Sequence, residues 1–541
     1  MTSPSSEPSS LSPLTKGVLF TTVGAGALTL GWLLMDDIIE RTASEKGENS
    51  GLSNPYRTQS TASDKRTSEH PPTNRPQEFD SVPSFARPGE RIVTFDSEKA
   101  YRKFLDSLSD SGVNLIGSID NLRTARVSFS DPNDLASLVD EDSLDFNYLV
   151  SLPPGAVAAD PGAVGFQNTA LDWLGITEDN STWGEGVTIA VIDSGVTNHP
   201  AINEEGIRRL DLTEDGTPQS GWNGHGTAVA SLISGQTNLS PGVAPSADIL
   251  DIRITDSEGS SDSFLLAEAI TTAVDNNADV INISLGSYGD SSAVRTAVEY
   301  AETNGVVIVA SSGNEGLEVP AFPAAYESVI AVGAVDATGD ILNFSNTGET
   351  LDITAPGLEV FSAWTNDSYV AFSGTSASAP YVAGAIAATS SEFGITSEQA
   401  AEIVFNNSNE AGPEGEDLTF GSGHLDVGRA INSTTRGIND IATTSILIDT
   451  EGTPTVTAVV QNQGTEVIRN ADLTIATPFA SFPLNVPQLQ PGATLSLQVP
   501  ASLPQDEEFS VTAAASLPQS FSDTDPTNDE NRSFFFLEPE I

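Results

Sequence analysis

The amino-acid sequence predicts an α/β domain with a parallel sheet and helices on both faces, between a small α+β unit and an all-β sandwich. Short apolar runs alternate with helical segments through the middle of the chain, which is typical of buried parallel strands. A β-α-β-β-α-β order precedes them, and after about Arg436 the helical patterns stop. The chain has 541 residues, too many for one core, so several domains are expected.

The first 86 residues carry no pattern of a packed domain. Residues 17–35 lack charge and are long enough for a membrane-span candidate, and both a cleaved secretory signal and a retained anchor fit residues 1–40. Either interpretation takes the rest of the chain out of the cytoplasm. Residues 41–86 are rich in Ser, Thr, Pro and charge, so we expect a disordered linker there.

Residues 87–152 are expected to form the small α+β unit, with a ferredoxin-like plan. Its first helix carries apolar side chains at helical spacing, and its second begins with a capping Asp followed by Pro. The expected elements are, in order, Arg91–Phe95, Ser97–Leu108, Val113–Gly117, Ala125–Phe129, Asp131–Leu138 and Phe146–Leu152. Residues 153–165, rich in Gly, Ala and Pro, form a connector in which we expect a processing site.

Residues 166–436 carry the α/β pattern. The expected strands are Val187–Ile192, Ile249–Ile254, Val280–Ser284, Val306–Ala310 and Val329–Val335. The expected helices are Thr227–Ile233, Phe264–Asn276, Ala293–Thr303, Ala379–Ser390 and Ser397–Asn406. Residues 437–541 are expected to form the sandwich, with strands at Ser445–Ile448, Thr455–Gln461, Ala471–Ala476 and Ala493–Val499.

Three glycine-containing motifs supply an acid, a base and a nucleophile. Asp193 ends an apolar strand, His225 lies between two glycines at the start of a helix, and Ser376 precedes an apolar helical run. Each residue alone has an ordinary explanation as a turn, loop or capping residue. Together, in the order Asp, His, Ser, they provide what acyl transfer needs, because a serine hydroxyl is a weak nucleophile until an imidazole takes its proton.

The motifs Val191-Ile192-Asp193-Ser194-Gly195, Asn223-Gly224-His225-Gly226-Thr227 and Gly374-Thr375-Ser376-Ala377-Ser378-Ala379-Pro380 resemble the acid, base and nucleophile segments of subtilisin-family serine endopeptidases. The resemblance covers roughly residues 166–434 and implies an Asp193, His225 and Ser376 triad. It also implies that Asn314, within Ser311-Ser312-Gly313-Asn314-Glu315-Gly316, is the side-chain oxyanion donor. The substrate-binding residues that it implies are Ser284, Leu285, Gly286, Ser311, Ser312, Gly313 and Ala321.

The same resemblance extends to the flanking parts of the chain. Residues 87–152 are similar in plan to the family's propeptide, which implies an intramolecular inhibitor, and residues 440–540 more weakly resemble an adhesion-type β domain. The primary pocket has no fixed charge in its implied walls, so apolar substrate side chains are expected there. Glu315 is expected at the pocket rim, where it would add tolerance for basic side chains, and a solvated carboxylate without a role is the alternative.

The chain is extremely acidic, with 75 Asp and Glu against 22 Lys and Arg and a net charge of −53. Lysine is absent after Lys103. Molar salt shortens the Debye length to ~3 Å and screens such repulsion, so we interpret the composition as adaptation to high salt. An ordinary acidic secreted protein is the alternative. Nucleic acid is not expected as a partner, because phosphate binding needs a basic surface.

No cofactor or metal is required by the implied chemistry, and the expected partners are protein or peptide substrates. The chain has no cysteine, which excludes disulfides and thiolate metal sites. A calcium loop of the family would fall at Gly235–Gly242, which is shorter than usual, and the acid-rich segment Asp256–Asp262 lacks a calcium-binding spacing. Structural calcium therefore has no recognisable site.

Two alternative functions remain at this stage. A catalytically idle surface protein, binding through the sandwich, is disfavoured by the intact set of Asp193, His225, Asn314 and Ser376. An esterase of the α/β-hydrolase kind is disfavoured because Ser376 lacks a G-x-S-x-G motif and the order of the three residues differs.

Overall fold

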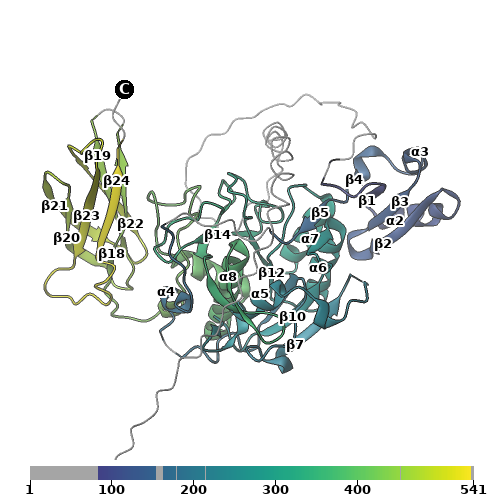
Figure 1. Ribbon diagram of the computed structural model, residues 1–541, viewed down its shortest axis with the longest axis horizontal. Coiled ribbons are helices and arrows are strands. Elements are labelled where there is room, and N and C mark those ends of the chain that lie inside the picture. Colours follow the sequence, from purple (N-terminus) through teal and green to yellow (C-terminus); the bar gives the residue numbers. More distant parts are fainter. Residues whose placement is uncertain are drawn as a thin grey trace, which may run out of the picture. The chain divides into compact units, whose positions relative to one another are not determined.

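The computed structural model describes residues 83, 85–153, 162–177, 179–213, 215–450 and 453–537. The candidate membrane span at residues 17–35, the linker at residues 41–86 except for its last few residues, and most of the 153–165 connector lie outside these ranges. Within the described ranges, no helix is long and apolar enough to cross a bilayer. Figure 1 shows three separately folded parts, coloured purple, teal to green, and yellow along the sequence.

The first part is a four-stranded antiparallel sheet in the order β2-β3-β1-β4, which confirms the ferredoxin-like plan. Its elements are β1 (Glu90–Thr94), α2 (Glu98–Ser107), β2 (Val113–Ile119), β3 (Thr124–Phe129), α3 (Pro132–Ala136) and β4 (Leu144–Asp145). Asp131 caps α3 as expected, because its carboxylate accepts the Asn133 N–H. Tyr101 and Phe104 of α2 are buried against the sheet.

The last strand expected in this part is wrong in its position. Only Leu144–Asp145 joins the sheet, whereas β5 (Leu149–Ser151) pairs with β11 (Ser260–Asp262), which belongs to the middle part. The sequence predicted one strand over Phe146–Leu152, but Leu149–Ser151 within it pairs with β11 instead of with the sheet of the first part. This pairing is important for the site described below.

The middle part contains a seven-stranded sheet in the order β15-β14-β13-β12-β6-β10-β7, and every neighbouring pair is parallel. The expected α/β architecture is therefore confirmed. The strands are β6 (Thr188–Asp193), β7 (Ile207–Asp211), β10 (Asp248–Arg253), β12 (Val280–Ile283), β13 (Val307–Ser311), β14 (Ile330–Val335) and β15 (Ile353–Pro356).

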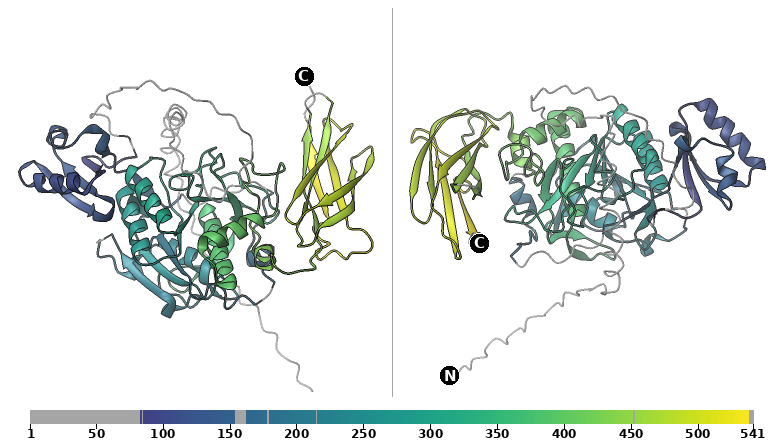
Figure 2. Two further views of the ribbon diagram at one scale, coloured as in Figure 1. Left: turned by 180° about the vertical axis from the view of Figure 1, so that it is seen from behind. Right: turned by 90° about the horizontal axis from the view of Figure 1, so that it is seen from above.

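Helices cover both faces of this sheet (Figure 2). Successive side chains of β6 point to opposite faces, so Ile189 and Val191 pack in one apolar cluster and Ala190 and Ile192 in another. The first cluster includes α5 (His225–Ser234), α8 (Thr375–Phe393) and α9 (Ser397–Asn406). The second includes α6 (Ser263–Asp275) and α7 (Ser292–Thr303).

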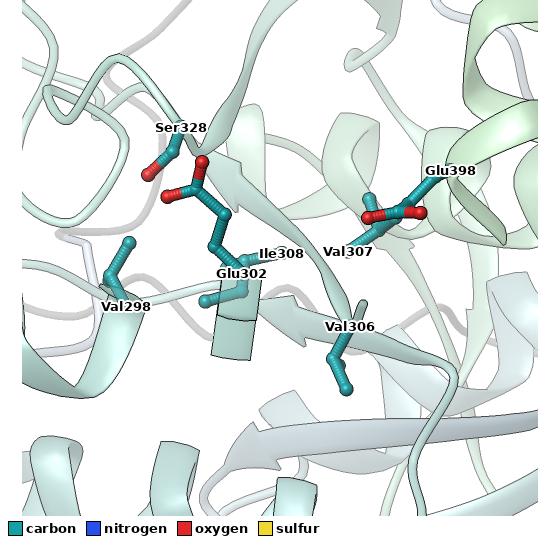
Figure 3. A pocket seen from close by; sticks show the side chains of 7 residues that line it. All are labelled: Val298, Glu302, Val306, Val307, Ile308, Ser328 and Glu398. Carbon is teal, nitrogen blue, oxygen red and sulfur yellow. The ribbon is translucent and has the colours of Figure 1, made fainter. Parts of the chain in front are cut away.

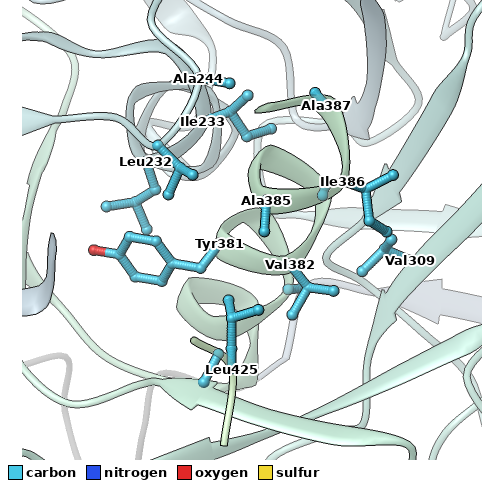
Figure 4. Packing of buried hydrophobic residues seen from close by; sticks show 14 of the residues in the cluster. Leu232, Ile233, Ala244, Val309, Tyr381, Val382, Ala385, Ile386, Ala387 and Leu425 are labelled. Atoms are coloured by element: carbon cyan, nitrogen blue, oxygen red, sulfur yellow. The ribbon is translucent and has the colours of Figure 1, made fainter. Parts of the chain in front are cut away.

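Helix α8 runs through the centre of the first cluster. Figure 4 shows Tyr381 and Ile386 among side chains of α5 and β13. Sixteen of its nineteen residues, Thr375 through Ser390, are buried, and each large apolar side chain removed from water stabilises the fold by ~1.5–3 kcal/mol. The helix begins four residues earlier than its apolar run predicts, which places Ser376 in its first turn.

The remaining elements of the middle part are short. They are α4 (Ala170–Trp173), β8 (Gln236–Thr237), β9 (Ser240–Pro241), β16 (Val360–Ala363), β17 (Tyr369–Phe372) and α10 (Val427–Asn432). The expected strands missed β7 and β15. Two arginines interrupt the apolar pattern of β7, which an edge strand tolerates because one side is unpaired.

The third part is a β-sandwich, as expected, with a three-stranded sheet β18-β19-β22 and a four-stranded sheet β21-β20-β23-β24 around one apolar core. Its strands are β18 (Ile441–Asp449), β19 (Thr455–Asn462), β20 (Ile468–Ala476), β21 (Ser481–Leu489), β22 (Thr494–Pro500), β23 (Glu508–Ser516) and β24 (Glu530–Phe536). Three of them escaped sequence analysis. β21 contains two prolines, which its position at a sheet edge permits.

Candidate active site

Asp193 and His225 are brought into direct contact. Asp193 is the last residue of β6 and is fully buried, and His225 is the first residue of α5. The His225 Nδ1 atom lies 2.9 Å from each carboxylate oxygen of Asp193. A carboxylate can only accept, so Nδ1 carries the proton and Nε2 is left with its lone pair free to act as a base.

Glycines allow the close packing that holds this pair. A side chain at Gly226 would lie 2.8 Å from the Gly195 carbonyl oxygen, and one at Gly224 would collide with the Trp364 ring. The Gly226 N–H donates instead to the Ser194 hydroxyl, which itself donates to the Asn223 carbonyl. Glycine is therefore needed on both sides of His225, because a larger side chain at either position would collide with its neighbours.

Ser376 lies in the first turn of α8, just after Gly374, whose φ of 130° is open to glycine. The Ser376 hydroxyl donates to the Ser284 carbonyl at 3.2 Å, so reaction requires a rotation about its Cα–Cβ bond toward His225. Hydrogen bonds of this kind commonly tighten only when substrate is present. The Ser376 N–H is one of the first amides of the helix, which have no partner within the helix.

Asn314 is oriented by the residue before the serine. Its Oδ1 atom accepts from both the N–H and the hydroxyl of Thr375, each at 2.9 Å. With the oxygen fixed in this way, the Nδ2 group faces the other way, and a side chain at Gly374 would lie 2.7 Å from it. Nδ2 and the Ser376 N–H can therefore both donate to a negative oxygen formed beside Ser376.

Ser284 supports the serine in a second way. Pro380 of α8 has no N–H to donate to the carbonyl of Ser376, four residues earlier. The Ser284 hydroxyl fills this place, donating to the Ser376 carbonyl at 3.3 Å, and itself accepts from the Asn282 side chain. A proline inside the helix is thus compatible with an intact first turn.

The other implied substrate-binding residues lie together. Leu285 and Gly286 follow Ser284 directly, and a side chain at Gly286 would lie 3.1 Å from the Cβ atom of Ala321. The Ala321 N–H donates to the Ser312 carbonyl at 2.8 Å, which ties Ala321 to the Ser311–Gly313 segment. The two segments and Ala321 are therefore neighbours, as the resemblance implied.

Glu315 lies beside the Ser311–Gly313 segment, since a side chain at Gly313 would come within 2.9 Å of its Oε2 atom. Oε2 accepts from the Tyr288 hydroxyl and from the Asn314 N–H, and the place of Glu315 at the pocket rim stays a prediction. Burial and then the charge of Glu315 raise the pKa of Tyr288. Asn346 completes the group, accepting from the Glu315 N–H at 3.2 Å and donating to Tyr288 at 2.7 Å.

Sequence analysis missed Thr375, Tyr288 and Asn346 as supporting residues. Thr375 adjoins Ser376 within a quoted motif, and its hydroxyl was the available signal. Tyr288 and Asn346 are 58 residues apart, and no local pattern links them to Asn314.

Strand β10, which pairs with the strand that ends at Asp193, carries two buried charged residues. Asp251 of β10 is fully buried and accepts the Val196 N–H at 2.9 Å, and burial raises its pKa to about 8. Arg253 ends β10 and is also fully buried. Its guanidinium bonds to both carboxylate oxygens of Asp215 and lies 5.2 Å from the centre of the Trp222 ring, which packs on Gly195.

Two other described histidines, His199 and His424, lie away from this pair. His199 accepts the Ala201 N–H at Nδ1 and lies within hydrogen-bond distance of the Ser368 carbonyl. His424 is partly buried, with its Nδ1 atom 2.7 Å from the Thr354 hydroxyl, and loss of solvent lowers its pKa to about 4. Neither contacts the Asp193 and His225 pair.

The cavity shown in Figure 3 is separate from the Asp193 and His225 pair. It is lined by Val298, Glu302, Val306, Val307, Ile308, Ser328 and Glu398. Val307 begins β13, so the cavity lies at the amino end of that strand, whereas Asp193 lies at a carboxyl end. Within the described ranges, no group of three or more His, Asp or Glu side chains is arranged to hold a metal ion.

Comparison with known proteins agrees with this geometry. Residues 184–423 match the Subtilase family of peptidases S8. The chain is 34% identical over 273 residues to the thermostable alkaline protease of Halalkalibacterium halodurans, covering 50% of this chain and 73% of that protein. It is 40% identical over 206 residues to thermitase of Thermoactinomyces vulgaris, covering 37% of this chain and 74% of thermitase.

Subtilisin E of Bacillus subtilis is 38% identical over 256 residues, which is 46% of this chain and 64% of subtilisin E. Among solved structures, the epidermin leader peptide processing serine protease of Staphylococcus aureus aligns with a TM-score of 0.52 at 21% identity. That alignment covers 64% of this chain and 99% of the other, and at this identity it shows the fold alone.

Proposed function

Because the chain belongs to the subtilase family of serine endopeptidases, we propose that Asp193, His225 and Ser376 perform its peptide hydrolysis. The observation that carries this assignment is the contact of His225 Nδ1 with both Asp193 oxygens, which leaves Nε2 as the base. His225 takes the Ser376 proton as Oγ attacks the peptide carbonyl, and Asp193 stabilises the imidazolium that forms.

The remaining steps use the same groups. Asn314 Nδ2 and the Ser376 N–H stabilise the oxyanion, which collapses to an acyl-enzyme as His225 gives its proton to the leaving amine. Water, deprotonated by His225, then releases the acyl group and restores Ser376. No metal or cofactor takes part in these steps.

A fluorophosphonate probe tests the assignment. We expect one adduct, on Ser376, with loss of labelling and of peptide hydrolysis in Ser376→Ala. Ser378→Ala is the matched control, since Ser378 lies one half-turn further along α8 with its hydroxyl bonded to the Ala355 carbonyl. An adduct on another serine would refute the assignment, and neither labelling nor hydrolysis by any form would favour the idle surface protein.

We further propose that residues 87–152 act as a propeptide that inhibits the catalytic domain before processing in the 153–165 connector. Ion pairs support this: Arg126 and Arg87 each contact Asp262 of β11, at 3.1 and 2.8 Å. The Ser292 N–H also donates to Asp145. In purified protein, Ser376→Ala should accumulate uncleaved, whereas normal maturation of that variant would show that another protease does the processing.

The substrates are proposed to be proteins or peptides with an apolar side chain in the primary pocket. The Ser284–Gly286 and Ser311–Gly313 segments and Ala321 carry no charge, and the Glu315 carboxylate is occupied by Tyr288 and Asn314. Cleavage profiling with a peptide library should therefore favour apolar over charged residues. Strict selection for Asp or Glu at the cleaved position would contradict this pocket.

An extracytoplasmic location, secreted or anchored through residues 17–35, is part of the same proposal, as is adaptation to high salt. The net charge of −53 motivates the latter. The unfolding midpoint should rise steeply from low to molar NaCl and less in an uncharged osmolyte of equal osmotic strength. Neutralising the consecutive exposed acids Asp506, Glu507 and Glu508 should reduce the salt required, and a midpoint independent of NaCl would reject salt adaptation.

A further inference from the structure

The segment that leaves the small α+β unit lies between two strands of the catalytic domain. β5 (Leu149–Ser151) pairs antiparallel with β11, and Val150 is opposite Ser261. On its other side Ser151 pairs antiparallel with Gly286. The Val150 side chain is only 1% exposed and packs in the same apolar cluster as Leu285, so this segment is anchored as well as hydrogen bonded.

The register of this segment fixes which residue lies beside the nucleophile. Ser151 and Gly286 exchange two hydrogen bonds, of 3.1 and 3.2 Å. This pair is an isolated bridge, but hydrogen-bonded pairs recur every second residue in an antiparallel ladder, so extending the register by two residues brings Pro153 to the position opposite Ser284. The Ser284 carbonyl is the group to which the Ser376 hydroxyl donates. In this register, the peptide bond that follows Pro153 is the one that would face Ser376.

Proline is unsuited to this position. Pro153 has no N–H to donate to the Ser284 carbonyl, which instead receives the Ser376 hydroxyl, and its ring holds φ near −65°, away from the φ of an antiparallel strand. The next residue in the sequence is Pro154. Acyl transfer would break the Pro153–Pro154 C–N bond, and His225 would have to deliver a proton to the Pro154 nitrogen. That nitrogen carries a ring carbon where other residues carry a hydrogen, which disfavours cleavage of this bond.

We propose that Leu149–Pro153 is a built-in substrate mimic that occupies the active site without being cleaved, so that the first processing cut falls downstream of Pro154. The inference rests on the proposed function, because it assumes that Ser376 is the nucleophile. Inhibition and processing would then need different positions of the same segment. In the position seen here the segment blocks the site, and cleavage requires it to leave the site or to shift along it.

The processing of the full-length chain tests the proposal, with intact mass and N-terminal sequencing as readouts. The wild-type chain should give no product that begins at Pro154, and its first new N-terminus should fall between residues 155 and 166. The Pro153→Ala/Pro154→Ala variant should be cut after residue 153, at least tenfold faster than the first wild-type cut. Pro526→Ala, which changes an exposed proline of the sandwich far from the connector in the sequence, should behave as wild type.

A peptide experiment covers the case in which the variants fail to fold. A synthetic peptide of residues 147–156, added to mature enzyme, should inhibit competitively and remain intact. The same peptide with Ala in place of both prolines should be hydrolysed after its seventh residue. Cleavage of the natural peptide between its prolines, or a wild-type product that begins at Pro154, would overturn the proposal.

Different results would refute the proposed function and the substrate mimic. Absence of Ser376 labelling together with absence of hydrolysis of any library peptide would refute the proposed function. Ser376 labelling and library hydrolysis, combined with cleavage at Pro153–Pro154 or with identical processing of wild type and the double-proline variant, would refute the substrate mimic alone.

Discussion

The two halves of the proposed active site are held by different kinds of interaction. Beside Asp193 and His225, two charged side chains, Asp251 and Arg253, are buried on the adjacent strand. Around Ser376 and Asn314, the groups that bond to the Ser376 carbonyl and to the Asn314 side chain are neutral, namely the Ser284 and Thr375 hydroxyls. The one carboxylate there, Glu315, accepts the Asn314 backbone N–H. Buried charges respond to pH and are costly when a partner is removed, whereas neutral hydrogen bonds contribute only about 0.5–1.5 kcal/mol each.

Because of this difference, substitutions in the two halves should affect different properties of the protein. Perturbing the acid–base half should change stability and pH dependence along with activity. Perturbing the nucleophile half should change activity with little effect on stability. Four substitutions, two of the reacting groups and two of the charged supports, separate these outcomes.

The largest expected effect is that of Asp193→Asn. An amide no longer fixes the His225 proton on Nδ1, so Nε2 loses its role as base in much of the population. In a serine protease triad this change lowers kcat by about 10⁴. Steady-state kinetics on a peptide substrate would measure it, and a loss smaller than tenfold would mean that Asp193 does not orient His225.

Asn314→Ala tests the neutral half. It removes one oxyanion donor, for which a loss of about 10²–10³ in kcat is established with subtilisin itself. KM should stay nearly constant, since Nδ2 acts on the oxyanion that forms during the reaction. An equal change in KM would indicate instead that Asn314 binds the ground state or holds the Thr375 backbone in place.

The proposed reacting groups could be predicted from the sequence because each lies in a short local motif. Asp193, His225 and Ser376 are specified by neighbours one or two residues away, such as the glycines that contact Gly195 and Trp364. The hydrogen bonds of Glu315 to Tyr288 and Asn346 were not predictable, because these residues are distant from it in the sequence. The fold was predictable to the same extent: buried strands showed continuous apolar runs, and the edge strands β7 and β21 did not.

Arg253→Met tests the charged half at the level of stability. The variant would leave Asp211 and Asp215 without the guanidinium to which they bond at 2.8–3.0 Å. Breaking a fully buried pair costs about 3–5 kcal/mol. The two carboxylates are about a third exposed, so solvent screens them and we expect a smaller loss than this, roughly 2–3 kcal/mol.

Chemical denaturation would measure the loss in Arg253→Met. Arg208→Met, on the neighbouring strand, is the matched control, because Arg208 is exposed and its guanidinium donates to a neutral group, the Asn276 carbonyl. A loss no larger than that of the control would show that the buried guanidinium contributes little.

The smallest expected effect, and the one most specific to the charged half, is that of Asp251→Asn. Burial raises the pKa of Asp251 to about 8 from an ordinary value of 3.8. Arg209, at 3.9 Å, lowers it, and the charges of Asp193 and Asp211 raise it further. The folded chain therefore holds a proton that the unfolded chain releases near pH 4, and folding stability contributed at this site is lost as pH rises from about 4 to about 8.

Asparagine resembles the protonated carboxyl and can still accept the Val196 N–H. The variant should match wild type near pH 4 and become more stable than wild type as pH rises, by at least ~1.4 kcal/mol at pH 8, the equivalent of one pKa unit. Thermal unfolding at pH 4, 6, 8 and 9 would measure the difference. A difference that does not grow with pH would mean that Asp251 is ionised throughout, and that Arg209 compensates its charge despite the 3.9 Å separation.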